Sequence, residues 1–163
     1  VDVRGWALAG ASAGATLALA AMIKRRDAGL ALPAAAALFY GCYTPDFETG
    51  SHARFGEGYL LTTANMRWYW RNYLGAAFGA PPALAAPLHA DLRGLPPLYL
   101  TVGGLDPLVD DTIRLADRLA AAGGAFRHDH VPGVVHGCLR MSRELAPAQA
   151  MIDAAAAYIT ERL

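Results

Sequence analysis

A Gly-x-Ser-x-Gly pentapeptide at residues 10–14 constrains the fold of this chain more than any other feature of its sequence. A short apolar run, residues 6–9, precedes it and a long stretch rich in Ala and Leu follows it, so it falls at a predicted strand-to-helix turn. In such a turn the serine leaves the strand with its hydroxyl exposed above the sheet. Because the backbone of such a turn is tight, we expect glycine to be sterically required before and after the serine. The small side chains of Ala11 and Ala13 fit the same lack of space.

The composition is that of a globular domain. The 163 residues suffice for one domain with a substantial core, 55% of them are hydrophobic, and 14 acidic residues balance 14 basic ones. No basic stripe follows the chain, and Lys24-Arg25-Arg26 closes a predicted helix, where cations suit the helix dipole. We therefore expect no nucleic-acid partner. Cys42 and Cys138 make no disulfide framework, so we expect free thiols in a reducing compartment, the cytoplasm.

An uncharged run from residue 5 to residue 23 has the outline of a membrane span or a signal sequence, since Arg4 precedes it and three basic residues follow it. Its many Ala, Gly, Ser and Thr residues insert poorly into a bilayer. A strand followed by a buried helix explains both the missing charges and the glycines. We therefore expect no membrane span.

Apolar periodicity predicts strands alternating with helices. Strands are expected at residues 3–9, 34–40, 98–102 and 125–131, and helices at residues 12–26, 62–74, about 110–122 and 148–162. The first strand should be buried on both faces, and the mixed polarity of the last suits a sheet edge. Leu17, Ala20 and either Met22 or Ile23 should face inward. The polar residues 44–58 are expected to cross the surface as a long loop.

Strands and helices that alternate at this spacing predict a parallel sheet covered on both faces, the α/β fold class. Reactive groups of such sheets gather at the carboxyl ends of the strands. Ser12 follows the first predicted strand, Asp106 the third and His136 the fourth. We therefore expect these three side chains to meet at one edge of the sheet.

The three side chains have the chemistry of nucleophilic catalysis. A serine hydroxyl needs a base to take its proton during attack, and His136, in a predicted loop flanked by glycines, is the candidate. A carboxylate must hold the imidazole in the right tautomer, and Asp106 fits because Pro107 keeps it out of helical geometry. The backbone N–H of Ala13, at a helix N-terminus, is the predicted oxyanion donor. Neither a metal nor an organic cofactor is required.

Two of these residues also have a simpler interpretation. Ser12 could be a helix N-cap, and Asp106 could form a turn with Asp110 as the true acid, although Asp110 is better placed to cap its own helix. His128 and His130 are spaced to share one strand face, but no convincing Cys or carboxylate set near them supports a metal site.

Segments spread over nearly the whole chain resemble the hormone-sensitive-lipase-like family of α/β-hydrolase esterases. They are the pentapeptide, Tyr59-Leu60-Leu61-Thr62, Trp68-Tyr69-Trp70, Ala86-Pro87-Leu88, Asp91-Leu92-Arg93-Gly94-Leu95-Pro96-Pro97, Gly104-Leu105-Asp106-Pro107-Leu108-Val109-Asp110 and His136-Gly137. The chain order Ser, Asp, His is the one expected of this fold. The resemblance implies a carboxylesterase that hydrolyses short- or medium-chain acyl esters of small molecules through an acyl-enzyme. It assigns Ser12 as nucleophile, Asp106 as acid and His136 as base.

The resemblance also implies a domain organisation. Residues 1–163 correspond to a partial α/β-hydrolase domain, in which residues 44–82 form part of a helical cap over the pocket. The aromatic residues 68–73 within this segment fit a core and a pocket equally well. Dimerisation through the last strand is a further implication of the resemblance, and the sequence itself does not test it.

Two departures from the family pattern matter. Ala11 stands where the family commonly has Asp, which alters a local hydrogen bond without touching the nucleophile. The family's His-Gly-Gly-Gly-type loop, which donates most of the oxyanion hole, lies upstream of the segments matched by this chain. We therefore expect a C-terminal fragment that needs the N-terminal half to cover the open edge of its first strand and to reach full activity.

Two functions of other classes compete with ester hydrolysis. A non-catalytic relative of the same fold could use the pocket only to bind a ligand, because a fold does not determine a function. A complete set of Ser12, Asp106 and His136 argues against it, since a binding module needs no such set. Dinucleotide binding is weaker still, because residues 10–14 lack the G-x-G-x-x-G spacing and no acidic residue ends the strand near Tyr40.

Overall fold

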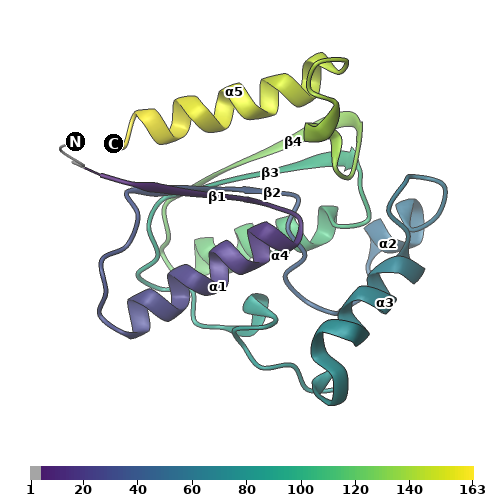
Figure 1. Cartoon of the computed structure of the whole chain (residues 1–163), viewed down its shortest axis with the longest axis horizontal. Coiled ribbons are helices and arrows are strands. Elements are labelled where there is room, and N and C mark those ends of the chain that lie inside the picture. Colours follow the sequence, from purple (N-terminus) through teal and green to yellow (C-terminus); the bar gives the residue numbers. More distant parts are fainter. Residues whose placement is uncertain (1–4) are drawn as a thin grey trace.

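Strands and helices alternate through residues 5–163, the part of the chain that the computed structural model describes (Figure 1). The elements are β1 (Ala7–Ala11), α1 (Ala13–Asp27), β2 (Ala35–Phe39), α2 (Gly50–Phe55), α3 (Thr63–Leu74), β3 (Leu98–Leu105), α4 (Val109–Ala121), β4 (Phe126–Val135) and α5 (Ala146–Thr160). Short 3₁₀ turns are η1 (Gly75–Ala77), η2 (Pro87–His89) and η3 (Cys138–Met141). The alternation predicted from the sequence is confirmed.

The described strands form one parallel sheet in the order β1-β2-β3-β4. Its register runs from Ala7 opposite Ala35 in the first pair to Leu105 opposite Val135 in the last. Helix α5 covers one face of this sheet, and α1 and α4 cover the other (Figure 1). The predicted parallel sheet with helices on both faces is therefore confirmed.

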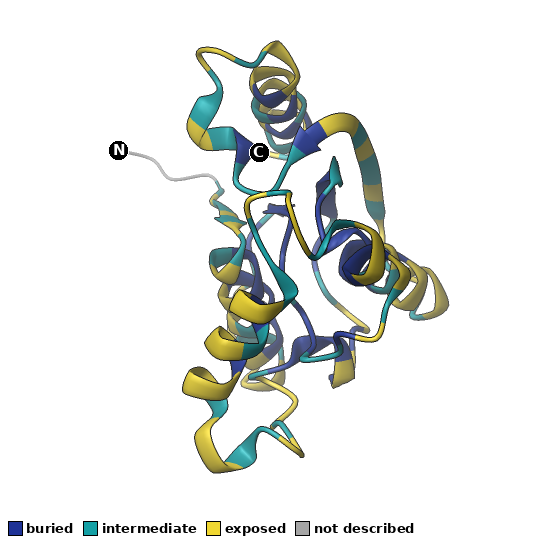
Figure 2. Ribbon diagram, turned by 90° about the vertical axis from the view of Figure 1, so that its right-hand side faces the viewer, coloured by how far each residue is buried: buried dark blue, intermediate teal, exposed yellow. Residues whose placement is uncertain are grey.

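Burial follows from these layers. Every residue of β2 is buried, as expected for an apolar strand with neighbours on both edges and helices on both faces. One apolar cluster, which includes Leu19 and Leu115, joins the sheet to α1 and α4. A second, which includes Tyr99 and Met151, joins it to α5. Figure 2 shows the buried ribbon concentrated in the strands and on the inward sides of the helices.

Strand β1 differs from its prediction in both bounds and burial. It spans Ala7–Ala11 rather than residues 3–9, and residues 3 and 4 lie outside the described part of the chain. Ala9 and Ala11 are exposed, so the predicted burial on both faces is wrong. The reason is that β1 is the outermost strand of the described sheet and has its partner, β2, on one side.

Helix α1 buries both Met22 and Ile23, where the sequence predicted one of the two, but Leu17 is 58% exposed. The inward position predicted for Leu17 is wrong because this side of α1 faces α3 across a cavity instead of facing the sheet. Neither α1 nor any other helix within residues 5–163 combines the length and the apolar character needed to cross a membrane. Both cysteines of the chain are free thiols, as predicted.

Strands β3 and β4 extend further than their patterns predict. Strand β3 continues through two glycines to Leu105, and β4 continues to Val135, so His136 follows the strand directly instead of lying in a longer loop. A Cβ on Gly103 would lie 2.5 Å from Val134 O, so glycine allows β4 to approach β3 closely. The glycines therefore end the apolar pattern without ending the strand.

Residues 44–58 are not the surface loop that their polarity predicts. They contain α2, in which Ser51 and His52 are buried. The backbone N–H of Ser51 donates to Asp110 Oδ2 at 2.8 Å and fixes α2 against α4. The predicted cap role of Asp110 is wrong, because the N-cap residue of α4 is Leu108 and the Asp110 carboxylate binds α2.

Helix α3 begins within one residue of its predicted start, where Thr62 Oγ1 accepts a hydrogen bond from Asn65 N at 3.0 Å. With α2 it lies beyond one end of the sheet (Figure 1). Its aromatic residues divide between the two environments that the sequence left open. Trp70 is buried, whereas Tyr69 and Tyr73 are 51% and 55% exposed.

Candidate active site

Ser12, in the turn between β1 and α1, has a backbone conformation that is rare for a residue with a side chain, with φ 55° and ψ −125°. Positive φ in a non-glycine residue is strained and persists only where the surroundings enforce it. The enforcing contacts are two hydrogen bonds of 2.9 Å, from Ser12 N to Phe39 O and from Ala15 N to Ser12 O. They tie the turn to the end of β2 and to the first turn of α1.

The two glycines of the pentapeptide differ in importance. A Cβ on Gly10 would overlap the carbonyl group of Gly14 and lie 2.7 Å from Ala15 N, so glycine is required there. A Cβ on Gly14 would meet nothing within 4 Å. The predicted steric requirement is therefore right at Gly10 and wrong at Gly14, because α1 has turned away from the strand by that residue. Ala11 and Ala13 are exposed and not crowded.

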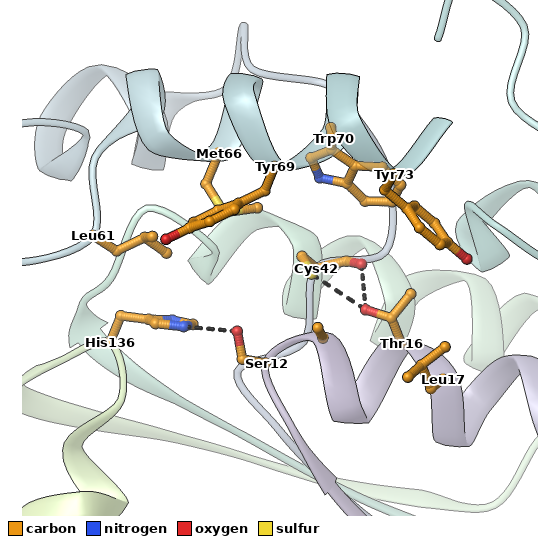
Figure 3. A pocket seen from close by; sticks show the side chains of 11 residues that line it. Ser12, Thr16, Leu17, Cys42, Leu61, Met66, Tyr69, Trp70, Tyr73 and His136 are labelled. Atoms are coloured by element: carbon orange, nitrogen blue, oxygen red, sulfur yellow. Dashed lines mark hydrogen bonds between the residues drawn. The ribbon is translucent and has the colours of Figure 1, made fainter. Parts of the chain in front are cut away.

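The structure brings Ser12, Asp106 and His136 together at the carboxyl ends of β1, β3 and β4. His136 Nε2 lies 2.9 Å from Ser12 Oγ, and His136 Nδ1 lies 2.7 Å from Asp106 Oδ2. The dashed line in Figure 3 marks the first of these contacts. Both are hydrogen-bond distances. The imidazole therefore bridges the hydroxyl and the carboxylate.

Asp106 is fully buried. Its Oδ1 accepts a hydrogen bond from Leu108 N at 2.8 Å, which leaves Oδ2 to the imidazole. Ser51 Oγ donates to Pro107 O at 2.7 Å, so α2 steadies the same loop. Asp110, the alternative acid, accepts from Ser51 N instead. The carboxylate beside the imidazole is thus that of Asp106.

The other histidines make different contacts. His52 and His89 hydrogen-bond to threonine hydroxyls at 2.8 and 3.1 Å. Burial, with a smaller effect of the neighbouring His130, holds the pKa of His128 below its usual value. Within residues 5–163, no group of three or more His, Cys, Asp or Glu side chains is arranged to hold a metal ion.

Ala13 is the first residue of α1, so its N–H has no acceptor within the helix. The N-terminus of a helix favours negative charge. This N–H adjoins Ser12, so it lies near the place where a carbonyl oxygen would gain negative charge if the serine attacked the carbonyl carbon. The role of Ala13 N–H as an oxyanion donor stays a prediction.

A cavity of about 490 Å³ opens beside Ser12 and His136. Helix α1 lies along one side of it and α3 along the other (Figure 3). Apart from Ser12, His136 and Thr16, its lining is mainly aliphatic and aromatic, with Leu17 on α1 and Tyr73 on α3. Such a cavity suits an apolar group that is attached to a carbonyl carbon beside the serine.

Tyr40, directly after β2, also contributes to the site and was not predicted from the sequence. Its ring packs edge-on against the His136 ring, with the centroids 4.8 Å apart. Burial raises the pKa of Tyr40 to about 12, so the phenol stays neutral at physiological pH. The available signal was its place at the end of a predicted strand, the same edge at which Ser12 was expected.

Asp111 was also missed. It is fully buried on α4, and its Oδ1 accepts hydrogen bonds from Tyr43 N at 2.9 Å and Thr44 N at 3.2 Å, while Oδ2 has no partner. Burial raises the pKa of this carboxyl group from 3.8 to about 7. Nothing local in the sequence distinguishes Asp111 from Asp110, because only the tertiary fold decides which of the two is buried.

Asp111→Asn is expected to stabilise the protein above pH 7 and to have little effect near pH 4. A pKa of about 7 in the folded state means that folding favours the neutral carboxyl group, so the wild type loses stability as pH rises from about 4 to 7. The full loss corresponds to at most about 4 kcal/mol. Urea unfolding of both proteins at pH 4.5 and 8 measures the difference, and an equal effect at both pH values would contradict the buried, neutral carboxyl.

A parallel sheet, a strained serine turn after β1, and an acid and a histidine after later strands together define an α/β-hydrolase. A family model described as alpha/beta hydrolase fold matches residues 1–140. The chain belongs to the hormone-sensitive-lipase-like family of α/β-hydrolase esterases.

Named relatives support this assignment. The chain is 41% identical over 130 residues to an acetyl-hydrolase from Streptomyces hygroscopicus, an alignment that covers 79% of this chain and 43% of the relative. It is 36% identical over 133 residues to the esterase LipI from Mycobacterium tuberculosis, covering 80% and 42%. The solved thermostable esterase from Pseudomonas putida ECU1011 matches with a TM-score of 0.91 and 30% identity, covering 96% of this chain and 51% of that one. The chain thus spans about half the length of the proteins it matches.

Proposed function

We propose that this chain carries the nucleophile, the base and the acid of a carboxylic ester hydrolase. The observation that carries the proposal is the hydrogen-bonded path from Ser12 Oγ through His136 to the buried Asp106 carboxylate, beside an apolar cavity. The names of two similar proteins, an acetyl-hydrolase and an esterase, denote the same class of reaction, which further supports the proposal.

The proposed reaction has two steps. As Ser12 Oγ attacks the ester carbonyl, His136 Nε2 takes the hydroxyl proton, and Asp106 stabilises the imidazolium that forms. The oxyanion accepts a hydrogen bond from Ala13 N–H. The tetrahedral intermediate then expels the alcohol, which takes the proton from His136, and leaves an acyl-enzyme. Water, activated by the same imidazole, attacks the acyl-enzyme and releases the carboxylic acid and Ser12.

The cavity supports an apolar substrate. Its volume of about 490 Å³ and its aliphatic and aromatic lining fit a short- or medium-chain acyl ester. Residues 44–82, which include α2 and α3, are proposed as part of a cap over this cavity, since α3 supplies Tyr69, Trp70 and Tyr73 to its lining.

Full turnover is proposed to need further oxyanion donors, which the family resemblance assigns to a loop upstream of the matched segments. Removing one such donor typically costs about 10²–10³ in rate. The decisive test is therefore covalent reaction of Ser12 with a fluorophosphonate, together with relative rates between variants. Both report whether the serine is activated. A folded chain whose Ser12 does not react would instead be a ligand-binding relative.

Asp106→Asn is expected to lower the rate of fluorophosphonate labelling and of p-nitrophenyl butyrate hydrolysis by about 10⁴-fold. Asparagine keeps the shape of the side chain, but it loses the negative charge and favours the wrong tautomer of His136. The matched control is Asp117→Asn, an exposed carboxylate of α4, which should react at the wild-type rate. Equal rates for Asp106→Asn and the wild type would exclude Asp106 as the acid.

A further inference from the structure

The turn that follows β2, residues 40–44 (the β2 turn), is held from two sides. From α1, Thr16 Oγ1 donates to Cys42 O at 2.5 Å. From α4, Asp111 Oδ1 accepts from the backbone N–H groups of Tyr43 and Thr44. The turn is thereby tied to α1, which begins beside Ser12, and to α4, which follows the loop that contains Asp106.

The β2 turn has a conformation that needs such support. Tyr40 has φ 39°, in the left-handed region that residues with a side chain rarely adopt. A Cβ on Gly41 would overlap the Tyr43 ring, which folds back over this glycine. Conformations of this kind typically cost about 1–3 kcal/mol and persist only where surrounding contacts enforce them.

The β2 turn contributes two groups to the candidate active site. Tyr40 packs its ring against the His136 ring, and Cys42 lies in the wall of the cavity, where Figure 3 shows it hydrogen-bonded to Thr16. A shift of the turn would therefore move the surface against which the imidazole rests and change the shape of the cavity. Thr16 and Asp111 thus affect the site indirectly, through the backbone of the β2 turn to which they hydrogen-bond.

We propose that Thr16 and Asp111 are positioning residues of the active site, which fix the β2 turn and through it the Tyr40 ring against His136. The inference rests on the proposed function for its consequence in catalysis. The geometry of the His136 ring can be measured without any catalysis, which separates the two.

Paired variants distinguish positioning from simple filling of space. Thr16→Val keeps the shape of the side chain and removes the hydroxyl donor, whereas Thr16→Ser keeps the hydroxyl. Asp111→Leu removes the acceptor for the two N–H groups, whereas Asp111→Asn keeps an acceptor oxygen. Asp117→Leu, at an exposed position of the same helix, is the control for an apolar substitution on α4.

The experiment follows the His136 ring signals of histidine-labelled protein by ¹H–¹³C NMR, with His136→Gln to assign them and Tyr40→Leu to identify the ring-current contribution of Tyr40. Thr16→Val and Asp111→Leu should shift these signals in the direction of Tyr40→Leu, and Thr16→Ser and Asp111→Asn should restore most of the wild-type shifts. Fluorophosphonate labelling should slow by up to about 100-fold in the first pair, the cost of displacing catalytic groups by about 1 Å.

Unchanged His136 signals in folded Thr16→Val and Asp111→Leu would overturn the inference. If Asp111→Leu fails to fold, Thr16→Val decides the question alone. Absence of labelling in the wild type would refute the proposed function, while the ring signals would still decide whether Thr16 and Asp111 position His136. Slower labelling with unchanged ring signals would also overturn it, because the effect would then bypass the imidazole.

Discussion

Ser12→Ala is expected to abolish fluorophosphonate labelling and to lower ester turnover by about 10⁶-fold, to the rate that binding and the oxyanion donors alone provide. In the proposed function the hydroxyl oxygen forms the covalent bond, and it lies 2.9 Å from the imidazole nitrogen that is proposed to take its proton. Alanine removes the nucleophile without adding volume. Intact-protein mass spectrometry measures the label, and p-nitrophenyl butyrate measures turnover.

A serine outside the site provides the control for this experiment. Ser142 follows the 3₁₀ turn η3 and does not line the cavity, so Ser142→Ala should be labelled at the wild-type rate. Peptide mapping of the labelled wild type should place the phosphonate on Ser12. A label retained by Ser12→Ala, or mapped to another residue, would remove Ser12 from the role of nucleophile.

The arrangement of the site could be predicted because the strands of a parallel sheet all end at the same edge. A residue that follows a strand in the sequence is therefore expected at that edge. The all-apolar β2 and the glycine-serine turn at Ser12 are signals carried by a few adjacent residues. Once they establish strands that alternate with helices, the ends of β1, β3 and β4 must lie on one edge. Asp106 and His136 each follow such an end, and no distance had to be known to expect them near Ser12.

The features that escaped prediction depend on residues far away in the chain. Leu17 was expected to face the core, yet it faces a cavity whose other wall is α3, and nothing near Leu17 encodes this. Asp110 and Asp111 are adjacent carboxylates. Only the packing of α2 makes Asp110 the hydrogen-bond acceptor of Ser51 N, and only the packing of the β2 turn buries Asp111. Polarity alone cannot tell which of two carboxylates is buried, since a polar side chain can be buried wherever the fold supplies a hydrogen-bond partner.

The same contrast explains the pentapeptide. The sequence presents Gly10 and Gly14 symmetrically about the serine, but the backbone does not treat them alike. Gly10 is the last-but-one residue of β1 and lies under the first turn of α1, so its missing side chain makes room for the helix. Gly14 already belongs to the helix and faces open space. The strained backbone of the pentapeptide lies between them, at Ser12, with φ 55°.

Gly10→Ala is therefore expected to destabilise the fold by about 3 kcal/mol, a large part of the 5–15 kcal/mol typical of a domain. The added Cβ would overlap the carbonyl group of Gly14, and backbone atoms cannot move aside as a flexible side chain can. Thermal unfolding should show a midpoint lower by roughly 10 °C, with labelling of Ser12 lost even where the protein remains folded.

Gly14→Ala is the matched partner of this substitution. It adds the same methyl group four residues away, within the first turn of α1 and with nothing within 4 Å of the new Cβ. Alanine favours a helix by about 1 kcal/mol over glycine, so Gly14→Ala should raise the unfolding midpoint slightly and leave labelling intact. Equal destabilisation by the two substitutions would mean that both glycines support the turn, and the asymmetry between Gly10 and Gly14 would have to be abandoned.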